Sequence, residues 1–347
     1  MKTLFKNLWA AFLLLPVFTG AQNAPTLFNL LKQDGVLKIE MELSLATLEE
    51  NIKTENYYPA VLRFTDNQGG LQEWDTKVRA RGRYRRRVCD FPPLKIDFAK
   101  DELEEKGLLP FDDLKLVTHC LEGSEGDELA LREYLGYVLY NKLSSRGLRA
   151  QLVEVTYKDT ESRRKITQYG ILLEDVDELA ARFDSEECEE CFGLPMAQFD
   201  TDNLRVHALF QYMIGNTDWS VAMCRNMKIM KPKNGGPYWL APYDFDFSGL
   251  VNASYAIPNP DLNQQYIGQR IYMGAEQANS ELQGTAAYFK ANQAEIYQAI
   301  EQFSLLSKRD RKEMLQYLDG FFKELDTGLV LHRDGLYDAT QDATGRK

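Results

Sequence analysis

The chain has 347 residues, of which 44% are hydrophobic and 27% charged, a composition typical of a folded protein rather than a disordered or collagen-like one. Its 52 acidic residues outnumber the 41 lysines and arginines, so the formal net charge is −11. Because phosphate neutralisation requires a basic face, a chain this acidic is not expected to bind nucleic acid or anionic membranes. Any anion that it binds must occupy a local basic pocket.

The first 21 residues have the pattern of a cleavable secretory signal peptide. Lys2 and Lys6 form a short basic segment, an apolar run follows from 8 to 18, and small residues end the pattern at Ala21. The apolar run is too short to anchor the chain stably in a bilayer, and no later stretch is apolar enough to do so. We therefore expect cleavage after Ala21, a secreted or periplasmic protein, and no transmembrane segment in the mature chain.

Export to an oxidising compartment permits disulfides among the five cysteines. Cys89 and Cys120 each lie beside a predicted strand, and we expect a disulfide between them that closes a loop of about 30 residues. Cys188 and Cys191 form a CxxC within an acidic run. The run lacks the partners of a zinc site and the strand-to-helix setting of a redox motif, so a short-range disulfide and two thiols both remain open. Cys224 is left over.

Residues 25–174 are predicted to form a strand-rich half. Side chains there alternate in character with a period of two, and turn signals at 66–70 and 91–93 separate the segments. One helix is expected within this half, over about 127–145, with leucines on its apolar side. The predicted strands are 36–43, 60–65, 74–83, 94–98, 114–118, 151–158 and 167–173.

Residues 175–330 are predicted to be rich in helix, and a polar tail follows at 331–347. A strand-rich half followed by a helix-rich half predicts an α+β protein with two lobes. The expected helices are 175–183, 202–214, 286–303 and 309–325, and a hairpin is expected from 226–230 and 238–241 around a KNGG turn.

The most distinctive local pattern is an alternation of arginines with other residues from 79 to 87. In an extended strand all five arginines would lie on one face, and Gly82 would permit the close approach of a backbone or ligand. Such a face could bind phosphate, or its arginines could pair with acidic side chains on a solvated strand, and both interpretations remain open. The five residues are Arg79, Arg81, Arg83, Arg85 and Arg87.

Carboxylates in the second half suggest a metal site. Asp244 and Asp246 form a D-x-D directly after an apolar strand, and Asp218 follows a helix. Extended backbone would point both carboxylates of the D-x-D the same way, which suits a hard cation with oxygen ligands, although a solvated turn is the alternative. Together with Asn226, these residues would supply a base and two or three metal-holding oxygens, the minimum set for phosphoryl transfer.

Six motifs occur in the order found in the spore coat CotH kinase-like family, which the sequence resembles over roughly 37–249. Members of that family have an atypical protein-kinase-like fold, and the better-known ones transfer phosphate from ATP to protein. The resemblance implies two lobes, a strand-rich N-terminal lobe with one main helix and a helix-rich C-terminal lobe. The motifs are RARGRYR at 79–85, FPPLKIDF at 91–98, LREY at 131–134, YGILLE at 169–174, GNTD at 215–218 and PYDFD at 242–246.

The resemblance also implies roles for the acidic residues. Asp218 resembles the aspartate that orients and deprotonates the acceptor hydroxyl, and Asn226 resembles an asparagine that helps to hold a metal ion. Asp244 resembles the metal-binding aspartate of the D-F-G motif, and Asp246 is counted with the metal ligands. The expected ion is Mg²⁺ or Mn²⁺.

The resemblance further implies a nucleotide site built from the first half of the chain. Lys95 would reach the nucleotide phosphates, with Glu133 on the following helix as its ion-pair partner. Arg81 and Arg83 would cover the phosphates in place of a glycine-rich loop. One cavity should then be lined by Lys95, Glu133, Asp218, Asn226 and Asp244. If Asp218 and Asp244 open onto a different surface from Lys95, the kinase-like mechanism fails and the hydrolase moves ahead of it.

We therefore expect a secreted, metal-dependent, kinase-like phosphotransferase that uses ATP or another nucleotide and a protein or envelope acceptor. Two alternatives belong to other classes of protein. One is a catalytically inactive kinase-like binding module whose arginines hold an anionic envelope ligand. The other is a metal-dependent hydrolase that uses Asp218, Asp244 and Asp246.

Overall fold

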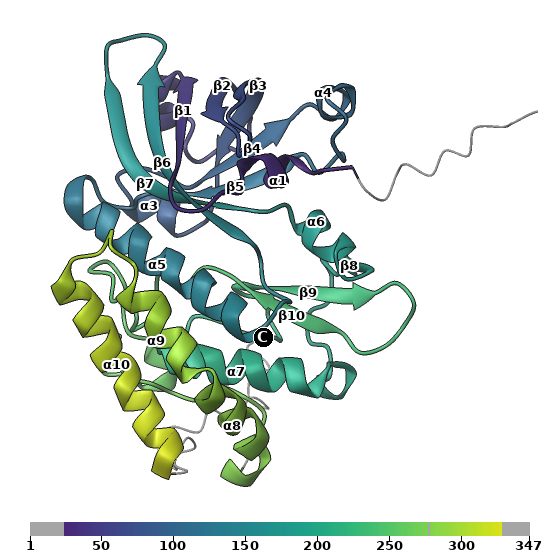
Figure 1. Cartoon of the computed structure of the whole chain (residues 1–347), viewed down its shortest axis with the longest axis vertical. Helices are drawn as coiled ribbons and strands as arrows, with labels where there is room; N and C mark the ends of the chain where they lie inside the picture. Colours follow the sequence, from purple (N-terminus) through teal and green to yellow (C-terminus); the bar gives the residue numbers. More distant parts are fainter. Residues whose placement is uncertain (1–23, 277, 328–347) are drawn as a thin grey trace, which may run out of the picture.

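The computed structural model describes residues 24–276 and 278–327 (Figure 1). The predicted signal peptide and the polar tail predicted over 331–347 lie outside these residues. Among the helices in the described ranges, none is both long and apolar enough to cross a membrane.

Seven strands close into a barrel in the order β1-β2-β3-β4-β5-β7-β6. Neighbouring strands pair antiparallel, except that β1 and β6 run parallel, with Leu37 opposite Val153. Alternate side chains of each strand are buried, so the barrel encloses its own apolar core around Trp74. The strands are β1 (Leu37–Leu43), β2 (Tyr58–Thr65), β3 (Leu71–Ala80), β4 (Leu94–Phe98), β5 (Asp113–Val117), β6 (Ala150–Asp159) and β7 (Lys165–Leu173).

The rest of the described chain is mainly helical and surrounds a second core (Figure 1). A three-stranded sheet in the order β10-β9-β8 belongs to this part. Its elements are α5 (Gly123–Leu143), α6 (Val176–Ala181), α7 (Thr201–Ile214), α8 (Gln283–Ala291), α9 (Gln293–Glu301), α10 (Lys308–Thr327), β8 (Ser185–Glu187), β9 (Met227–Pro232), β10 (Trp239–Pro242), and the 3₁₀ turns η1 (Met196–Gln198), η2 (Pro260–Leu262) and η3 (Asn279–Leu282). Short helices beside the barrel are α1 (Leu27–Leu31), α2 (Leu45–Glu50), α3 (Arg85–Val88) and α4 (Lys100–Glu105).

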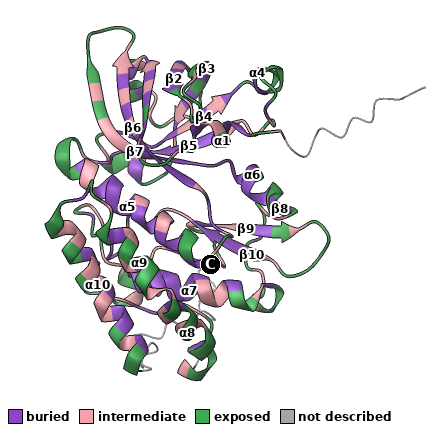
Figure 2. Ribbon diagram, viewed as in Figure 1, coloured by how far each residue is buried: buried purple, intermediate pink, exposed green. Residues whose placement is uncertain are grey.

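The predicted two-lobed kinase-like fold is wrong. The strand-rich half is a closed mixed barrel, because β1 and β6 pair with each other and leave no open edge. Its expected main helix, α5, shares the second core with α7 and α10, and Figure 2 shows that much of its length is buried. The period-two pattern showed which segments are strands, but strand pairing depends on contacts between residues far apart in the chain. The α+β class itself is correct.

The boundaries of one predicted strand and one predicted helix differ from those that the sequence pattern indicated. The strand expected over 74–83 stops at Ala80, because Gly82 takes a left-handed conformation with φ +80° and α3 begins at Arg85. The helix expected over 286–303 is two helices, since Asn292 ends α8 and caps α9. The strand predicted over 94–98 is confirmed as β4.

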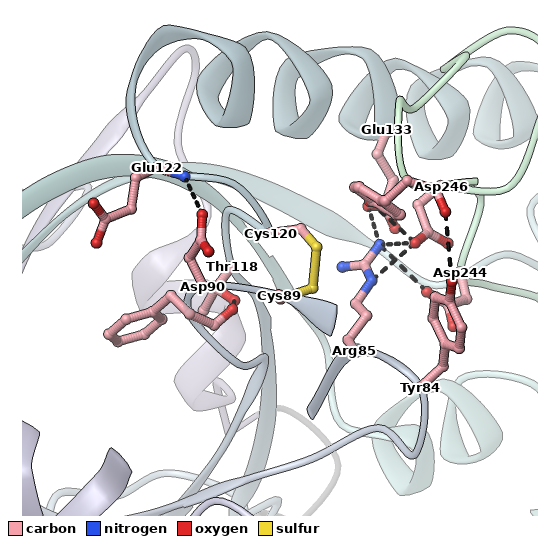
Figure 3. The surroundings of a disulfide bond; sticks show 12 residues. Tyr84, Arg85, Cys89, Asp90, Thr118, Cys120, Glu122, Glu133, Asp244 and Asp246 are labelled. Carbon is pink, nitrogen blue, oxygen red and sulfur yellow. Dashed lines mark hydrogen bonds and ion pairs between the residues drawn. A yellow bond between two sulfur atoms is a disulfide. The ribbon is translucent and has the colours of Figure 1, made fainter. Parts of the chain in front are cut away.

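The predicted disulfide between Cys89 and Cys120 is confirmed, with a Cα–Cα distance of 4.5 Å. It ties the end of α3 to the segment after β5, and Asp90 N donates to Cys120 O at 2.8 Å beside it (Figure 3). Cys188 and Cys191 also form a disulfide, which settles the alternative left open for the CxxC. Cys224 is a free thiol.

Candidate functional site

A cavity of about 450 Å³ opens between the barrel and the helical part. The turn after β3 forms one wall, and the loop after α7, the segment after β10 and a loop at 257–261 form the others. Arg85 and Asp246 both line this cavity, although they are 161 positions apart in the sequence. The charged residues that line it and were predicted as site residues are Arg81, Arg83, Asp218, Asp244 and Asp246.

Asp218 is held rigidly at the end of α7. The helix stops at Gly215, whose left-handed backbone (φ 65°) turns the chain toward the cavity. A side chain at this position would also collide with the hydroxyl of Tyr317, because a Cβ there would lie 1.9 Å from it. Asn216 Oδ1 then accepts from Asp218 N at 2.9 Å. Burial raises the pKa of the Asp218 carboxyl, Arg225 opposes the rise and Asp244 adds to it.

Asn226 lies against Asp218. Its Nδ2 donates to Asp218 Oδ2 at 2.9 Å and to Asp218 O at 2.6 Å. Its backbone is left-handed, with φ 56°, which places the amide toward the aspartate rather than along the strand that follows. In the structure Asn226 therefore orients Asp218, and its role as a metal ligand stays a prediction.

The D-x-D segment is not extended, because Asp244 takes a left-handed backbone with φ 65°. Asp244 N donates to the hydroxyl of Tyr137 on α5 at 3.0 Å, and Phe245 packs directly on Gly136. The side chain of Asp244 is 37% exposed, whereas that of Asp246 is 5% exposed. The two carboxylates therefore differ in role, since Asp244 opens to the cavity and Asp246 lies in its floor.

Arg85 is the ion-pair partner of Glu133 (Figure 3). Its Nη2 lies 2.7 Å from Glu133 Oε2, 2.9 Å from Asp246 Oδ2 and 3.6 Å from Asp244 Oδ1. Its Nε donates to the same Asp246 oxygen at 2.9 Å, and the hydroxyl of Tyr255 donates there at 3.1 Å. This guanidinium is buried among three carboxylates, which we call the acidic cluster: Glu133, Asp244 and Asp246.

The acidic cluster carries more negative charge than Arg85 neutralises. Burial raises the pKa of Asp246 to about 8 and also raises that of Glu133, while the guanidinium of Arg85 opposes both shifts. The carboxylates in turn keep the pKa of Arg85 well above its ordinary value despite its burial. Three carboxylates and one guanidinium have a formal charge of −2 when all are ionised, which a divalent cation would offset.

The donor set fits a divalent metal ion. One oxygen from each residue of the acidic cluster lies within 4.8 Å of the others. Glu133 is 3% exposed, and its Oε1 has no hydrogen-bond partner. A buried carboxylate oxygen without a partner is costly unless a cation lies beside it, and oxygen ligands suit Mg²⁺ or Mn²⁺.

Lys95 is not where the resemblance placed it. Its Nζ pairs with Asp113 Oδ2 at 2.5 Å, and it does not line the cavity. Lys115 is its cross-strand neighbour on β5 and lies nearer the acidic segment, with its Nζ 5.9 Å from the ring centre of Tyr243. Burial, together with the nearby charges of Lys228 and Arg81, lowers the pKa of Lys115 to about 7. The pairing of Lys95 with Glu133 is therefore wrong.

The five arginines do not share one face, because the strand ends before the second of them. Arg79 pairs with Glu55, and Arg87 donates to the backbone oxygen of Arg83. Arg81 and Arg83 line the cavity, and neither forms an ion pair with any residue that the structure describes. The lining holds four arginines and four aspartates, so its formal charge is balanced, and the two guanidinium groups without an ion pair are available to an anionic ligand.

Sequence reasoning missed Arg85 as the partner of the acidic cluster and Lys115 as the lysine beside Tyr243. Neither has a distinguishing local signal, since Arg85 is one arginine in a repeated run and Lys115 stands in an LKL context much like that of Lys95. Comparison of the chain with protein-family models and with curated proteins finds no match. The geometry of the cavity therefore carries the functional argument.

Proposed function

We propose that this protein is a metal-dependent phosphotransferase that moves phosphate from a nucleotide to a hydroxyl on a protein or other acceptor, as the resemblance to the CotH family implies. The observation that supports this most is that one cavity is lined by a partly buried aspartate, two carboxylates of the acidic cluster and two unpaired arginines, with an oxygen of the buried Glu133 within 4.8 Å of those two carboxylates. Phosphoryl transfer needs little more than positioning and neutralisation of charge, and these groups supply both.

Asp218 accepts the proton of the attacking hydroxyl. Its raised pKa makes it a better base than an ordinary surface aspartate, and its contacts with Asn226 and Asn216 hold it in one orientation. Arg225 lies 3.3 Å from the other carboxylate oxygen and keeps the ionised form accessible.

Asp244 and Glu133 would hold the metal ion, which supplies neutralisation of phosphate charge when bound. Asp244 faces the cavity and Glu133 offers its unpartnered oxygen from below. Arg81 and Arg83 bind phosphate oxygens from the barrel side. Lys115, like Lys95, is not in the lining of the cavity, but it is partly buried beside Tyr243 and close enough to Arg81 for their charges to interact, so it replaces Lys95 as the candidate for the phosphate-binding lysine.

A metal-dependent hydrolase is the second candidate. Of the five residues expected in one cavity only Asp218 and Asp244 line it, so the kinase-like mechanism that required Lys95 there fails, and this outcome favours the hydrolase. Water instead of a hydroxyl would then be the acceptor, with Asp218 in the same role. No feature of the described residues specifically supports the third possibility, a binding module without catalytic activity. Asp218 and the carboxylates of the acidic cluster are all present.

Export of the protein is part of the same proposal. The two disulfides require an oxidising environment in most organisms, which agrees with the predicted signal peptide. A nucleotide donor would then be supplied outside the cytosol.

The test uses ATP labelled at the γ-phosphate, with Mn²⁺ and a mixture of exported proteins as acceptors. Label in protein supports the phosphotransferase, and release of free phosphate alone supports the hydrolase. Asp218→Asn and Asp244→Asn should each abolish turnover, whereas the exposed Asp75→Asn should retain it. Asp244→Asn should also abolish the metal-dependent part of thermal stabilisation by the nucleotide. Absence of both products, with no stabilisation by nucleotide, would refute the proposal.

A further inference from the structure

Arg85 occupies the position within the acidic cluster where a cation would be expected. Its Nη2 lies within 3.6 Å of an oxygen from all three carboxylates. The side chain is 7% exposed, so the positive charge is almost fully removed from water. Such a burial is stable only when carboxylates surround the guanidinium, as they do here.

Arg85 occupies one oxygen of Asp246. That oxygen, Oδ2, accepts from Arg85 Nε, Arg85 Nη2 and the hydroxyl of Tyr255. An oxygen with three donors has no lone pair left for a metal ion. The other oxygen, Oδ1, accepts none of these hydrogen bonds, so it stays available to a cation together with Asp244 and Glu133 Oε1.

The position of Arg85 is fixed from the barrel side. It begins α3, a helix of one turn, and the Cys89–Cys120 disulfide ties the end of that helix to the segment after β5 (Figure 3). The disulfide therefore anchors the backbone segment from which the Arg85 side chain reaches the acidic cluster.

We infer that Arg85 is a built-in cation that takes one of two cation positions in the acidic cluster and so limits the site to a single divalent ion. This inference rests on the proposed function, because it specifies how the phosphotransferase site binds metal. With Arg85 in place the acidic cluster keeps a formal charge of −2, which one divalent ion offsets, whereas two divalent ions would leave this buried cluster with a net positive charge.

The test counts Mn²⁺ bound to the full chain by equilibrium dialysis with elemental analysis, after removal of metal by chelation. The wild-type protein should bind one ion per chain, and Asp244→Asn should lose it, which separates this ion from ions on the acidic surface. Arg85→Met should bind a second ion or bind the first at least about tenfold more tightly, because a positive charge has left the cluster. Arg85→Lys should keep one ion at similar affinity.

Arg85→Met could fail to fold, because the buried carboxylates of Glu133 and Asp246 lose their ion-pair partner. A second variant therefore keeps the inference testable. Arg85→Met with Asp246→Asn keeps the formal charge of the cluster at −2, so it should bind one ion with near wild-type affinity. Two ions on the wild-type protein, or an unchanged count and affinity in a folded Arg85→Met, would overturn the inference and leave the proposed function standing. Absence of any Mn²⁺ binding to the wild-type protein would overturn both.

Discussion

We predict that Gly136→Ala destabilises the protein, although alanine is the better helix former. Gly136 lies within α5, and a Cβ there would lie 2.9 Å from Phe245 Cδ2 and 3.3 Å from Phe245 Cβ. Phe245 cannot move away easily, because it is fully buried, with ring centres at 4.7 Å from Tyr137 and 5.6 Å from Phe210.

The net effect can be estimated from two opposing contributions. Replacing a glycine within a helix by alanine stabilises by up to about 1 kcal/mol. Overpacking a core position of this kind costs about 1–3 kcal/mol. With the full helix gain subtracted, we expect the free energy of unfolding to fall by up to about 2 kcal/mol. Because Phe245 stands between Asp244 and Asp246, its displacement should also weaken Mn²⁺ binding.

The assay is urea unfolding followed by circular dichroism, with Gly284→Ala as the matched control. Gly284 is also helical, on α8, but a Cβ there meets nothing within 4 Å, so alanine should be neutral or stabilising at that position. Adding Phe245→Leu to Gly136→Ala should recover part of the lost stability by making room. A Gly136→Ala protein as stable as the wild type would refute the packing argument.

Three further predictions follow from other parts of the molecule. Replacing Cys89 and Cys120 with alanine should lower the free energy of unfolding by roughly 3 kcal/mol in a urea titration, because the disulfide closes a long loop. Burial lowers the pKa of His207 to about 3, so the unfolded chain gains a proton below about pH 6.5 that the folded protein does not. Stability should therefore fall as the pH drops from about 6.5 toward 3, with a shallower fall for His207→Leu in urea midpoints measured across that range. Lys115→Met should reduce thermal stabilisation by ATP with Mn²⁺ more than Lys95→Met does, and equal effects would contradict the assignment of Lys115.

The sequence alone predicted that two of the candidate aspartates would share one cavity. The GNTD and PYDFD segments pointed to Asp218 and Asp244, and both line one cavity. These predictions succeeded because each depends on neighbours in the chain, a helix end in one case and a strand end in the other. The Cys89–Cys120 disulfide was predicted for a similar reason, since both cysteines flank strands.

Only the tertiary structure decided which basic side chain forms ion pairs with the acidic cluster. The sequence offered many arginines and lysines, and nothing local separated Arg85 from its neighbours or Lys95 from Lys115. The choice depends on where the chain turns at Gly82 and on the pairing of β4 with β5, and Arg85 reaches carboxylates 48 and 161 positions away. The closure of the barrel was undetermined for the same reason. Periodicity is a property of adjacent residues, whereas strand partners and ion pairs are selected by packing between distant segments.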